Sequence, residues 1–401
     1  MPAFLFPGQG AQRPGMGLPW TGHPSWEVVD DASDAAGRDV GWLLCAAGET
    51  ELTETRNAQL ATFVFSLMVL DAVERLGIEP TRLAGHSVGE YTALAASGIL
   101  GFEDSVRIVA ERGEAMQAAA DANPGVMTLL SGCDADTADI ACRLADGDVW
   151  VANFNAADET VIAGRPEPVE RAAAVAVELG ASRAAPVRVG GAFHTPFMAS
   201  ARDRLRKSLA TATFHDPDTP VVANVDGRFH SAGDEWKLLL SAQLCSPVRW
   251  YQSVLRLGGV SDPELEPARL FVELGPGDSL STTVRRILPS AATVAVSVPE
   301  DLDRLVDALS GDSALHAYAA GHHGELLYVS ERVVISPAAG VFQPAADCPD
   351  EPGAPVEVGT VLGGVGDQPV LSPFAGTLQG FLAQPGERVQ AGQPIAWLHS
   401  A

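Results

Sequence analysis

A serine between two glycines is the residue of this chain whose type and spacing best suit a nucleophile. The run Gly85-His86-Ser87-Val88-Gly89 has the G-x-S-x-G pattern and lies between a strand-like segment at 83–85 and a helix-like segment at 88–97. Flanking glycines let a strand and a helix approach closely, so that the turn holds the hydroxyl out into a cleft. The helix start adds N–H groups and partial positive charge near a reacting carbonyl. The pattern predicts that Ser87 is a nucleophile, with a structural turn as the alternative.

A serine nucleophile needs a general base, and His194 is the best candidate. It lies in the run from Gly190 to Phe197, where the chain would return to the cleft after a predicted insert. His86 adjoins Ser87, but a neighbour on the elbow usually points its ring away from the hydroxyl, so we expect it to be structural or to contact the acyl group. The other histidines lie in polar or loop contexts. The adjacent pair at 322–323 is only a weak metal hint, and no metal site is expected.

Two further motifs could hold anionic parts of a substrate. Gly8-Gln9-Gly10 follows a strand-like run, and a turn there can present backbone N–H groups to an oxyanion. Arg112 lies in a helix-like segment at 109–116. If it faces the cleft, its guanidinium can bind a carboxylate through two parallel hydrogen bonds. The residues alone leave this open, because an arginine on an amphipathic helix is usually solvated.

The elements that must position these residues alternate along residues 1–310. Short β-branched runs alternate with alanine-rich helical patterns, which favours a mostly parallel sheet covered by helices. We expect an α/β fold with an α/β-hydrolase-like large subdomain. The segment at about 125–190 reads βαββαβ, the order of a ferredoxin-like insert. Continuation of the larger sheet is the alternative.

Composition changes near residue 330. Residues 331–401 hold 9 of the 28 prolines and 10 of the 40 glycines, a density that suits a small all-β domain with many turns. The pattern of Ile335–Gly340 recurs at Leu371–Gly376, and the glycine-valine-glycine spacing at 353–359 recurs at 386–392. Two copies predict two similar halves related by a pseudo-two-fold axis. Residues 311–330 are the predicted linker.

Charge and cysteine content exclude several classes of protein. The 401 residues carry a formal charge of −25 with only two lysines, Lys207 and Lys237, which argues against nucleic acid or an anionic membrane as partner. The apolar run at 60–70 is too short to span a bilayer and reads as a buried helix. The first residues lack the features of a signal peptide. Five scattered cysteines without a CxxC pair favour reduced thiols, and we expect a cytoplasmic protein.

Seven motifs occur in an order that resembles one enzyme family. They are Phe6-Pro-Gly-Gln-Gly-Ala-Gln, Gly85-His-Ser-Val-Gly-Glu, Arg112-Gly-x-x-Met116, Ala152-Asn-Phe-Asn155, Ala192-Phe-His194, Gln243-x-x-x-Pro-Val-Arg-Trp250 and Val272-Glu-Leu-Gly-Pro-Gly277. Over residues 2–300 the chain resembles the malonyl-CoA:acyl-carrier-protein transacylases, the acyltransferases of fatty-acid and polyketide synthesis.

This resemblance implies a ping-pong reaction through a malonyl ester of Ser87, with His194 as general base. It implies that the backbone carbonyl of Gln243 orients the histidine and that the N–H groups of Gln9 and Val88 form the oxyanion hole. Arg112 matches the arginine that binds the malonyl carboxylate, and no cofactor beyond the CoA thioester is expected. Further substrate contacts are implied for Met116, Phe193, His86, Gln59 and Asn155.

Residues 331–401 resemble biotinyl/lipoyl carrier domains, which have a flattened all-β barrel. Those domains carry their cofactor on a lysine at a hairpin between the two halves, which here falls near 363–368. No lysine follows Lys237, so neither biotin nor lipoate can be attached to a lysine. We expect a degenerate module that docks a synthase or carboxylase partner. A β-rich appendage without a partner is the alternative.

Two other readings of the whole chain remain open. One is an acyl hydrolase that clears stalled acyl groups, although a dicarboxylate-binding Arg112 counts against it. The other is a scaffold in which the C-terminal module binds a partner and catalysis is secondary. For docking of an acidic carrier protein we expect a basic patch, with a solvated helix face as the alternative. Its members would be Arg202, Arg204, Arg206 and Lys207.

Overall fold

The computed structural model describes most of the chain and separates it into two units. The described residues are 2–261, 266–310, 324–326, 331–345, 353–366, 368–373 and 375–399. Most of the predicted linker, with both histidines at 322–323, lies outside them. One unit comprises Met1–Ala72 and Glu79–Leu305, and the other comprises Val73–Ile78 and Val306–Ala401. Within the described segments, no helix has the length and apolarity that crossing a membrane would require.

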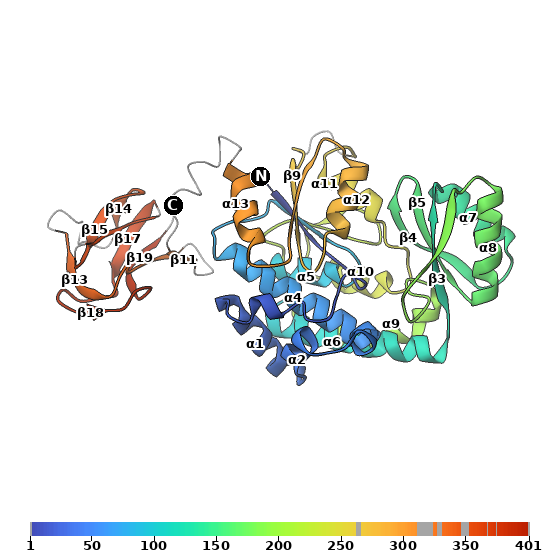
Figure 1. The fold of residues 1–401 in the computed structure, drawn as a ribbon, viewed down its shortest axis with the longest axis horizontal. Helices are drawn as coiled ribbons and strands as arrows, with labels where there is room; N and C mark the ends of the chain where they lie inside the picture. The colour runs from blue at the N-terminus through green and yellow to red at the C-terminus, as the bar shows by residue number, and fades with distance from the viewer. Residues whose placement is uncertain are drawn as a thin grey trace. The chain divides into compact units, whose positions relative to one another are not determined.

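The first unit is built on a six-stranded sheet with the order β10-β9-β1-β2-β7-β8 (Figure 1). Its strands are β1 (Pro2–Phe6), β2 (Arg82–Gly85), β7 (Val221–Val222), β8 (Phe229–His230), β9 (Leu270–Leu274) and β10 (Ala292–Val296). All neighbouring strands are parallel except β7 and β8. Every residue of β1 is buried, as a parallel sheet with helices on both faces requires. The predicted mostly parallel sheet is confirmed.

Helices cover this sheet and carry most of the site. They are α1 (Glu27–Ala36), α2 (Val40–Cys45), α3 (Glu49–Thr53), α4 (Thr55–Glu74), α5 (Gly89–Ala96), α6 (Phe102–Ala122), α9 (Ala199–Thr211), α10 (Glu235–Gln243), α11 (Trp250–Leu257), α12 (Ser279–Ile287) and α13 (Asp301–Ser310). Helix α4 is buried along almost its whole length, which confirms the buried helix expected at 60–70. Helix α5 follows β2 directly and packs against both β1 and β2.

The insert forms a sheet of its own, visible beside the main sheet in Figure 1. Its elements are β3 (Val126–Ser131), α7 (Ala135–Leu144), β4 (Val149–Ala156), β5 (Glu159–Gly164), α8 (Pro166–Glu178) and β6 (Arg183–Val187). The strand order β4-β5-β3-β6, antiparallel throughout, is that of a ferredoxin-like fold. The insert is therefore not a continuation of the larger sheet.

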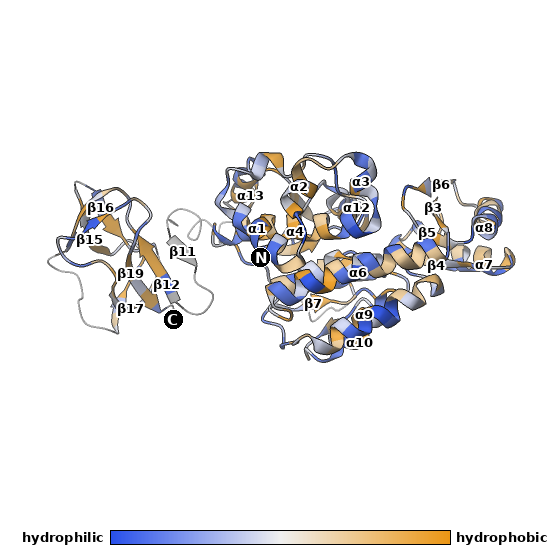
Figure 2. Ribbon diagram, turned by 90° about the horizontal axis from the view of Figure 1, so that it is seen from below, coloured by the Kyte–Doolittle hydropathy of each residue, from blue (hydrophilic) through white to orange (hydrophobic). Residues whose placement is uncertain are grey.

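The described part of the C-terminal module is all β, with sheet orders β11-β12-β19-β17-β14 and β16-β15-β13-β18. Its strands are β11 (Gly324–Leu326), β12 (Glu331–Ile335), β13 (Gly340–Pro344), β14 (Ala354–Val356), β15 (Val361–Val365), β16 (Gln368–Leu371), β17 (Gly376–Phe381), β18 (Arg388–Val389) and β19 (Pro394–His399). Figure 2 colours much of β19 hydrophobic. Side chains from these strands build a separate apolar core around the buried Phe342.

Hydrogen bonds in this module repeat in the way that the sequence repeats. Strand β13 of the first copy pairs with β18 of the second, and β17 of the second pairs with β14 of the first. The backbone of Ser336 likewise bonds to Gly392 and Gln393, while that of Ser372 bonds to Gly359 and Thr360. Each copy therefore completes the other, as expected for two halves related by a pseudo-two-fold axis.

Candidate active site

Ser87 lies at a sharp turn between β2 and α5, with a backbone φ of +54°. A Cβ on Gly85 would lie 1.9 Å from the carbonyl oxygen of Gly89, and a Cβ on Gly89 would lie 2.1 Å from that of Phe6. No side chain fits at either distance, so both glycines of the motif are required for the strand and helix to approach. The elbow expected from the sequence is thus present.

Asn224, at the end of β7, holds the backbone of this turn. Its side-chain oxygen accepts from the N–H of Ser87 at 2.8 Å, and its amide nitrogen donates to the carbonyl of Gly85 at 2.7 Å. These bonds stabilise a serine in the left-handed region, where a non-glycine residue is strained. Asn224 could not be predicted from the sequence, because only the pairing of β7 with β2 places it beside the elbow.

His194 contacts the serine hydroxyl. Its Nε2 lies 2.8 Å from Ser87 Oγ, and its Nδ1 lies 2.9 Å from the backbone carbonyl oxygen of Gln243. A carbonyl oxygen only accepts hydrogen bonds, so Nδ1 carries the proton and Nε2 is free to accept one from Ser87. Burial, together with the positive charge of Arg112, lowers the pKa of His194 to about 3. The imidazole is therefore neutral near pH 7, as a general base must be.

Arg112 is fully buried on α6 and faces the same hydroxyl. Its Nη2 donates to Ser87 Oγ at 3.1 Å and to Gln243 Oε1 at 2.9 Å, while Nη1 donates to Gln59 Oε1 at 2.5 Å. The guanidinium also lies over the ring of Tyr91, 5.1 Å from its centroid. Each of these groups is neutral, so among the described residues the cation lies beside Ser87 Oγ without a directly bonded anion. The structure buries Arg112 beside Ser87 and not on a solvated face.

Gln243 and Glu90 complete the cluster. The Gln243 Nε2 donates to the backbone carbonyl of Ser87 at 2.9 Å and to Glu90 Oε2 at 2.5 Å. The N–H of Asn224 donates to the other oxygen of Glu90 at 2.6 Å. Burial raises the pKa of Glu90, although these donors and the charge of Arg112 act in the opposite direction. Because both contacts are donated to its oxygens, the geometry is that of the ionised carboxylate. Glu90 was not among the residues expected from the sequence, although it directly follows the second glycine of the elbow.

The loop after β1 lies against the elbow, where the sequence analysis expected an oxyanion hole. The N–H of His86 donates to the carbonyl of Phe6 at 2.9 Å, and a Cβ on Gly8 would lie 2.7 Å from the carbonyl oxygen of His86. Within the described part of the chain, no hydrogen bond uses the N–H of Gln9 or of Val88. Both donors remain available for a substrate oxygen.

Three of the five expected substrate contacts, Gln59, Met116 and Phe193, are buried. Gln59 Nε2 donates to the sulfur of Met116 at 3.2 Å, and the oxygen of the same amide accepts from Arg112. Phe193 is buried directly before His194. Gln59 lies on α4 and Met116 lies on α6. These two helices approach closely, since a Cβ on Gly113 would lie 2.9 Å from the Cα of Arg56.

The other two expected contacts lie on the insert side. His86 packs edge-on against Trp250 with 5.7 Å between ring centroids, and burial lowers its pKa to about 4. The ring is thus neutral and turned toward an indole, which suits a structural role. Asn155 donates to Glu159 at 3.2 Å, and its side-chain oxygen is buried without a hydrogen bond. The Asn155 side chain also acts to raise the pKa of His86, the residue before Ser87, while no hydrogen bond within the described residues joins it to Ser87, His194 or Arg112.

The four basic residues expected to dock a carrier protein all lie on α9. Arg204 forms two hydrogen bonds to Glu111, at 2.5 and 2.9 Å, and Arg202 bonds to its neighbour Asp203. Arg206 donates to Ser241 and lies 3.8 Å from the same aspartate. Acidic neighbours therefore offset much of the positive charge, and the patch is weaker than a run of basic residues suggests.

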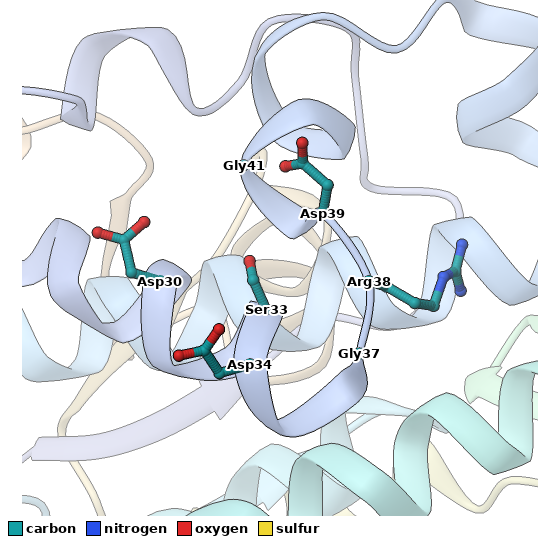
Figure 3. Close-up of a pocket in the computed structure, with 7 residues that line it drawn as sticks. All are labelled: Asp30, Ser33, Asp34, Gly37, Arg38, Asp39 and Gly41. Carbon is teal, nitrogen blue, oxygen red and sulfur yellow. The ribbon is translucent and has the colours of Figure 1, made fainter.

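A hollow at the surface lies between α1 and α2 (Figure 3). Its polar side chains already hold the local backbone: Asp39 accepts from the N–H of Trp42 at 2.7 Å, and Ser33 donates to the carbonyl of Val29. Arg38 donates to the carbonyl of Arg56. The hollow shares no residue with the serine cluster.

Comparison with known proteins agrees with this geometry. A family profile described as "Acyl transferase domain" matches residues 3–312. The malonyl CoA-acyl carrier protein transacylase of Bacillus subtilis (strain 168) is 36% identical over 316 residues, covering 78% of this chain and 98% of the relative. The crystal structure of a protein from Streptococcus pneumoniae titled MCAT superposes with a TM-score of 0.72 at 36% identity, covering 77% of this chain and 100% of the other.

A third comparison includes a partner. A structure titled as a malonyl-transacylase in complex with its type II PKS acyl-carrier protein superposes with a TM-score of 0.71 at 33% identity. It covers 76% of this chain and 99% of the other. These proteins are matched over nearly their full length, whereas about a quarter of this chain is left unmatched.

Proposed function

This chain belongs to the acyl transferase family, and we propose that it transfers a malonyl group from malonyl-CoA to the phosphopantetheine thiol of an acyl carrier protein. The observation that carries this function is the fully buried Arg112, which donates a hydrogen bond to the oxygen of Ser87. An unpaired buried cation is unfavourable, and so is an unpaired buried carboxylate. A malonyl group brings its own carboxylate to this guanidinium, whereas an acetyl group leaves it unmatched.

The reaction follows from the positions of three side chains. Ser87 gives its proton to His194 Nε2 as its oxygen attacks the thioester carbonyl, and the N–H groups of Gln9 and Val88 stabilise the oxyanion. The carbon–sulfur bond then breaks, CoA leaves as a thiol with the proton from His194, and a malonyl ester of Ser87 remains. The carrier thiol next gives its proton to His194 and attacks the ester carbonyl. The bond between that carbon and Ser87 Oγ breaks, the serine oxygen takes the proton back from His194, and the malonyl thioester of the carrier protein is released.

Hydrolysis by water is the competing outcome. A thioesterase of this fold would use the same serine and histidine, but it has no need to hold a dicarboxylate. Arg112 therefore favours malonyl transfer over editing. A purely structural scaffold would not need His194 and Arg112 within hydrogen-bond distance of the Ser87 hydroxyl.

Labelling with radioactive malonyl-CoA tests the nucleophile. Incubation followed by denaturation should leave one malonyl group per chain as an ester of Ser87, and Ser87→Ala should take up none. Ser253→Ala is the matched control, because Ser253 is a buried serine that donates only to the carbonyl of Arg249. Label on another residue in the wild-type protein would overturn the mechanism.

For residues 331–401 we propose a carrier-type β domain that has lost its cofactor and serves to dock a synthase or carboxylase. The reciprocal pairing of its two copies supports the fold. Strands β15 and β16 form a hairpin, with Val365 opposite Gln368, at the place where a biotinyl or lipoyl lysine would lie. The chain has no lysine beyond Lys237, so a cofactor amide to lysine cannot form there.

A further inference from the structure

Glu90 is a buried carboxylate at the centre of the site that the mechanism above does not use. It is 1% exposed on α5, three residues after the nucleophile. One of its oxygens accepts from Gln243 Nε2 at 2.5 Å, and the other accepts from the backbone N–H of Asn224 at 2.6 Å. Both partners are donors, so each oxygen of the carboxylate acts as an acceptor.

The two residues that donate to Glu90 also hold the catalytic groups. Asn224 bonds to the backbone of the elbow on both sides of His86. The backbone carbonyl of Gln243 accepts from His194, and its side-chain oxygen accepts from Arg112 at 2.9 Å. An amide side chain has one donor side and one acceptor side, so its orientation decides whether Arg112 meets an oxygen or an N–H group.

We propose that Glu90 is a positioning residue, whose carboxylate orients the Gln243 amide so that its oxygen faces Arg112 and keeps the guanidinium beside Ser87. This inference rests on the proposed role of Arg112 in binding the malonyl carboxylate. Glu90 itself touches neither the reacting atoms nor the guanidinium through any hydrogen bond within the described chain. Its effect therefore passes through Gln243.

Replacement of Glu90 by glutamine, its uncharged isostere, should reverse the orientation of the Gln243 amide. In Glu90→Gln, the new oxygen can satisfy the fixed N–H of Asn224, which leaves an NH₂ group facing Gln243. Gln243 must then turn its oxygen toward residue 90 and its NH₂ toward Arg112, where two donors meet. The rotation also takes the Nε2 donor away from the backbone carbonyl of Ser87, whose turn is still held by Asn224. His194 keeps its partner, because it bonds to the backbone carbonyl of Gln243. The substitution should harm recognition of malonate more than acyl transfer itself.

Acyl transfer from malonyl-CoA and from acetyl-CoA, measured on full-length protein, tests the proposal. Glu90→Gln should lower the malonyl-to-acetyl ratio of kcat/KM about tenfold, since a hydrogen bond to a charged group is lost. Glu273→Gln is the matched control. Glu273 is also a fully buried glutamate, but it lies in β9 and outside the cluster, and its carboxylate accepts from the backbone N–H groups of Leu280 and Ser281 in the first turn of α12. The Glu273→Gln variant should lose thermal stability and keep the wild-type malonyl-to-acetyl ratio of kcat/KM.

Two further variants separate the possible failures. Gln243→Met removes the amide, keeps the backbone carbonyl, and should lower the ratio even if Glu90→Gln does not fold. A wild-type ratio in folded Glu90→Gln or in Gln243→Met would overturn the positioning role. Arg112→Ala is measured in parallel. If Arg112→Ala itself keeps the malonyl preference, the proposed role of Arg112 fails, and with it the premise for Glu90.

Discussion

Arg112 has the contacts expected of a residue that binds an anionic ligand. Three neutral oxygens, those of Gln59, Gln243 and Ser87, accept from it, and its Nε has no hydrogen bond. Burial lowers the pKa of this guanidinium, although arginine remains protonated in any case. A substrate carboxylate would replace one or more of these neutral acceptors with an anion, which can form an ion pair with two parallel hydrogen bonds to the guanidinium.

Replacement of Arg112 by alanine should therefore change substrate preference. We expect malonyl transfer to fall by about 100-fold or more, since a buried charged pair is lost, and acetyl transfer to fall much less. Steady-state kinetics with both CoA esters would measure this. Equal losses with the two substrates would remove the carboxylate-binding role.

The buried state of His194 predicts an unusual pH dependence. Its pKa is lowered from 6.5 to about 3, so the histidine stays neutral as the pH falls through 6.5. The kcat/KM for malonyl-CoA should then be level between about pH 5 and 7, where an ordinary histidine base would lose activity as it takes up a proton. A loss of rate with a midpoint near 6.5, in protein that remains folded, would contradict this assignment.

Residues whose role depends on a motif could be predicted, while residues whose role depends on contacts could not. Ser87 and His194 stand in recognisable local sequences, and the structure brings them to 2.8 Å. Asn224 follows a strand of only two residues, and Glu90 looks like one more polar residue at a helix start. Their importance arises from partners more than 130 positions away, and no local pattern records those partners.

At the scale of elements, the site depends on how closely neighbouring strands and helices approach one another. Gly85 and Gly89 let β2, α5 and β1 meet, while Gly113 lets α6 lie against α4. The second contact matters for chemistry because Arg112 on α6 bonds to Gln59 on α4. Gly85 and Gly89 could be recognised from the motif, but no function was predicted for Gly113, which follows Arg112.

Gly113→Ala tests this helix contact. The added Cβ would lie 2.9 Å from the Cα and 3.1 Å from the carbonyl oxygen of Arg56, and backbone atoms cannot rotate away. We expect a loss of about 1–3 kcal/mol in stability from overpacking, with malonyl transfer reduced more than acetyl transfer. Thermal unfolding and the two transfer assays would measure both effects.

Gly101→Ala provides the comparison, because Gly101 precedes the same helix and a Cβ there meets no atom within 4 Å. It should leave the preference for malonyl-CoA unchanged. If Gly113→Ala behaved like Gly101→Ala, the close approach of α4 and α6 would not control the position of Arg112.

At the scale of the whole molecule, the chain consists of two units with separate cores. Relatives that are matched over almost their full length correspond to about three quarters of this chain, so the acyl transferase domain has counterparts that consist of little else. The β module has its own apolar core and its own internal pairing. Nothing in the proposed chemistry uses a residue from this module.

Removal of residues 331–401 should therefore leave acyl transfer largely intact. We expect kcat/KM with malonyl-CoA and a free carrier protein to stay within about twofold of the full-length value, while any retention by a synthase or carboxylase partner is lost. Transfer assays and co-purification would measure the two effects. A truncated protein that precipitates or loses activity would show instead that the module protects the acyl transferase domain.

The sequence by itself predicted Ser87 as nucleophile and His194 as its base, and it determined the order of the elements and the absence of a lysine after Lys237, because each depends on residue type or local spacing. Only the tertiary structure decided that Arg112 faces the serine, that acidic neighbours offset the charge of α9, and that Glu90 and Asn224 join the site. Side-chain direction and charge pairing depend on which distant elements pack together. The net charge of −25 excluded some partners, but the position of one buried arginine is what favours a malonyl substrate.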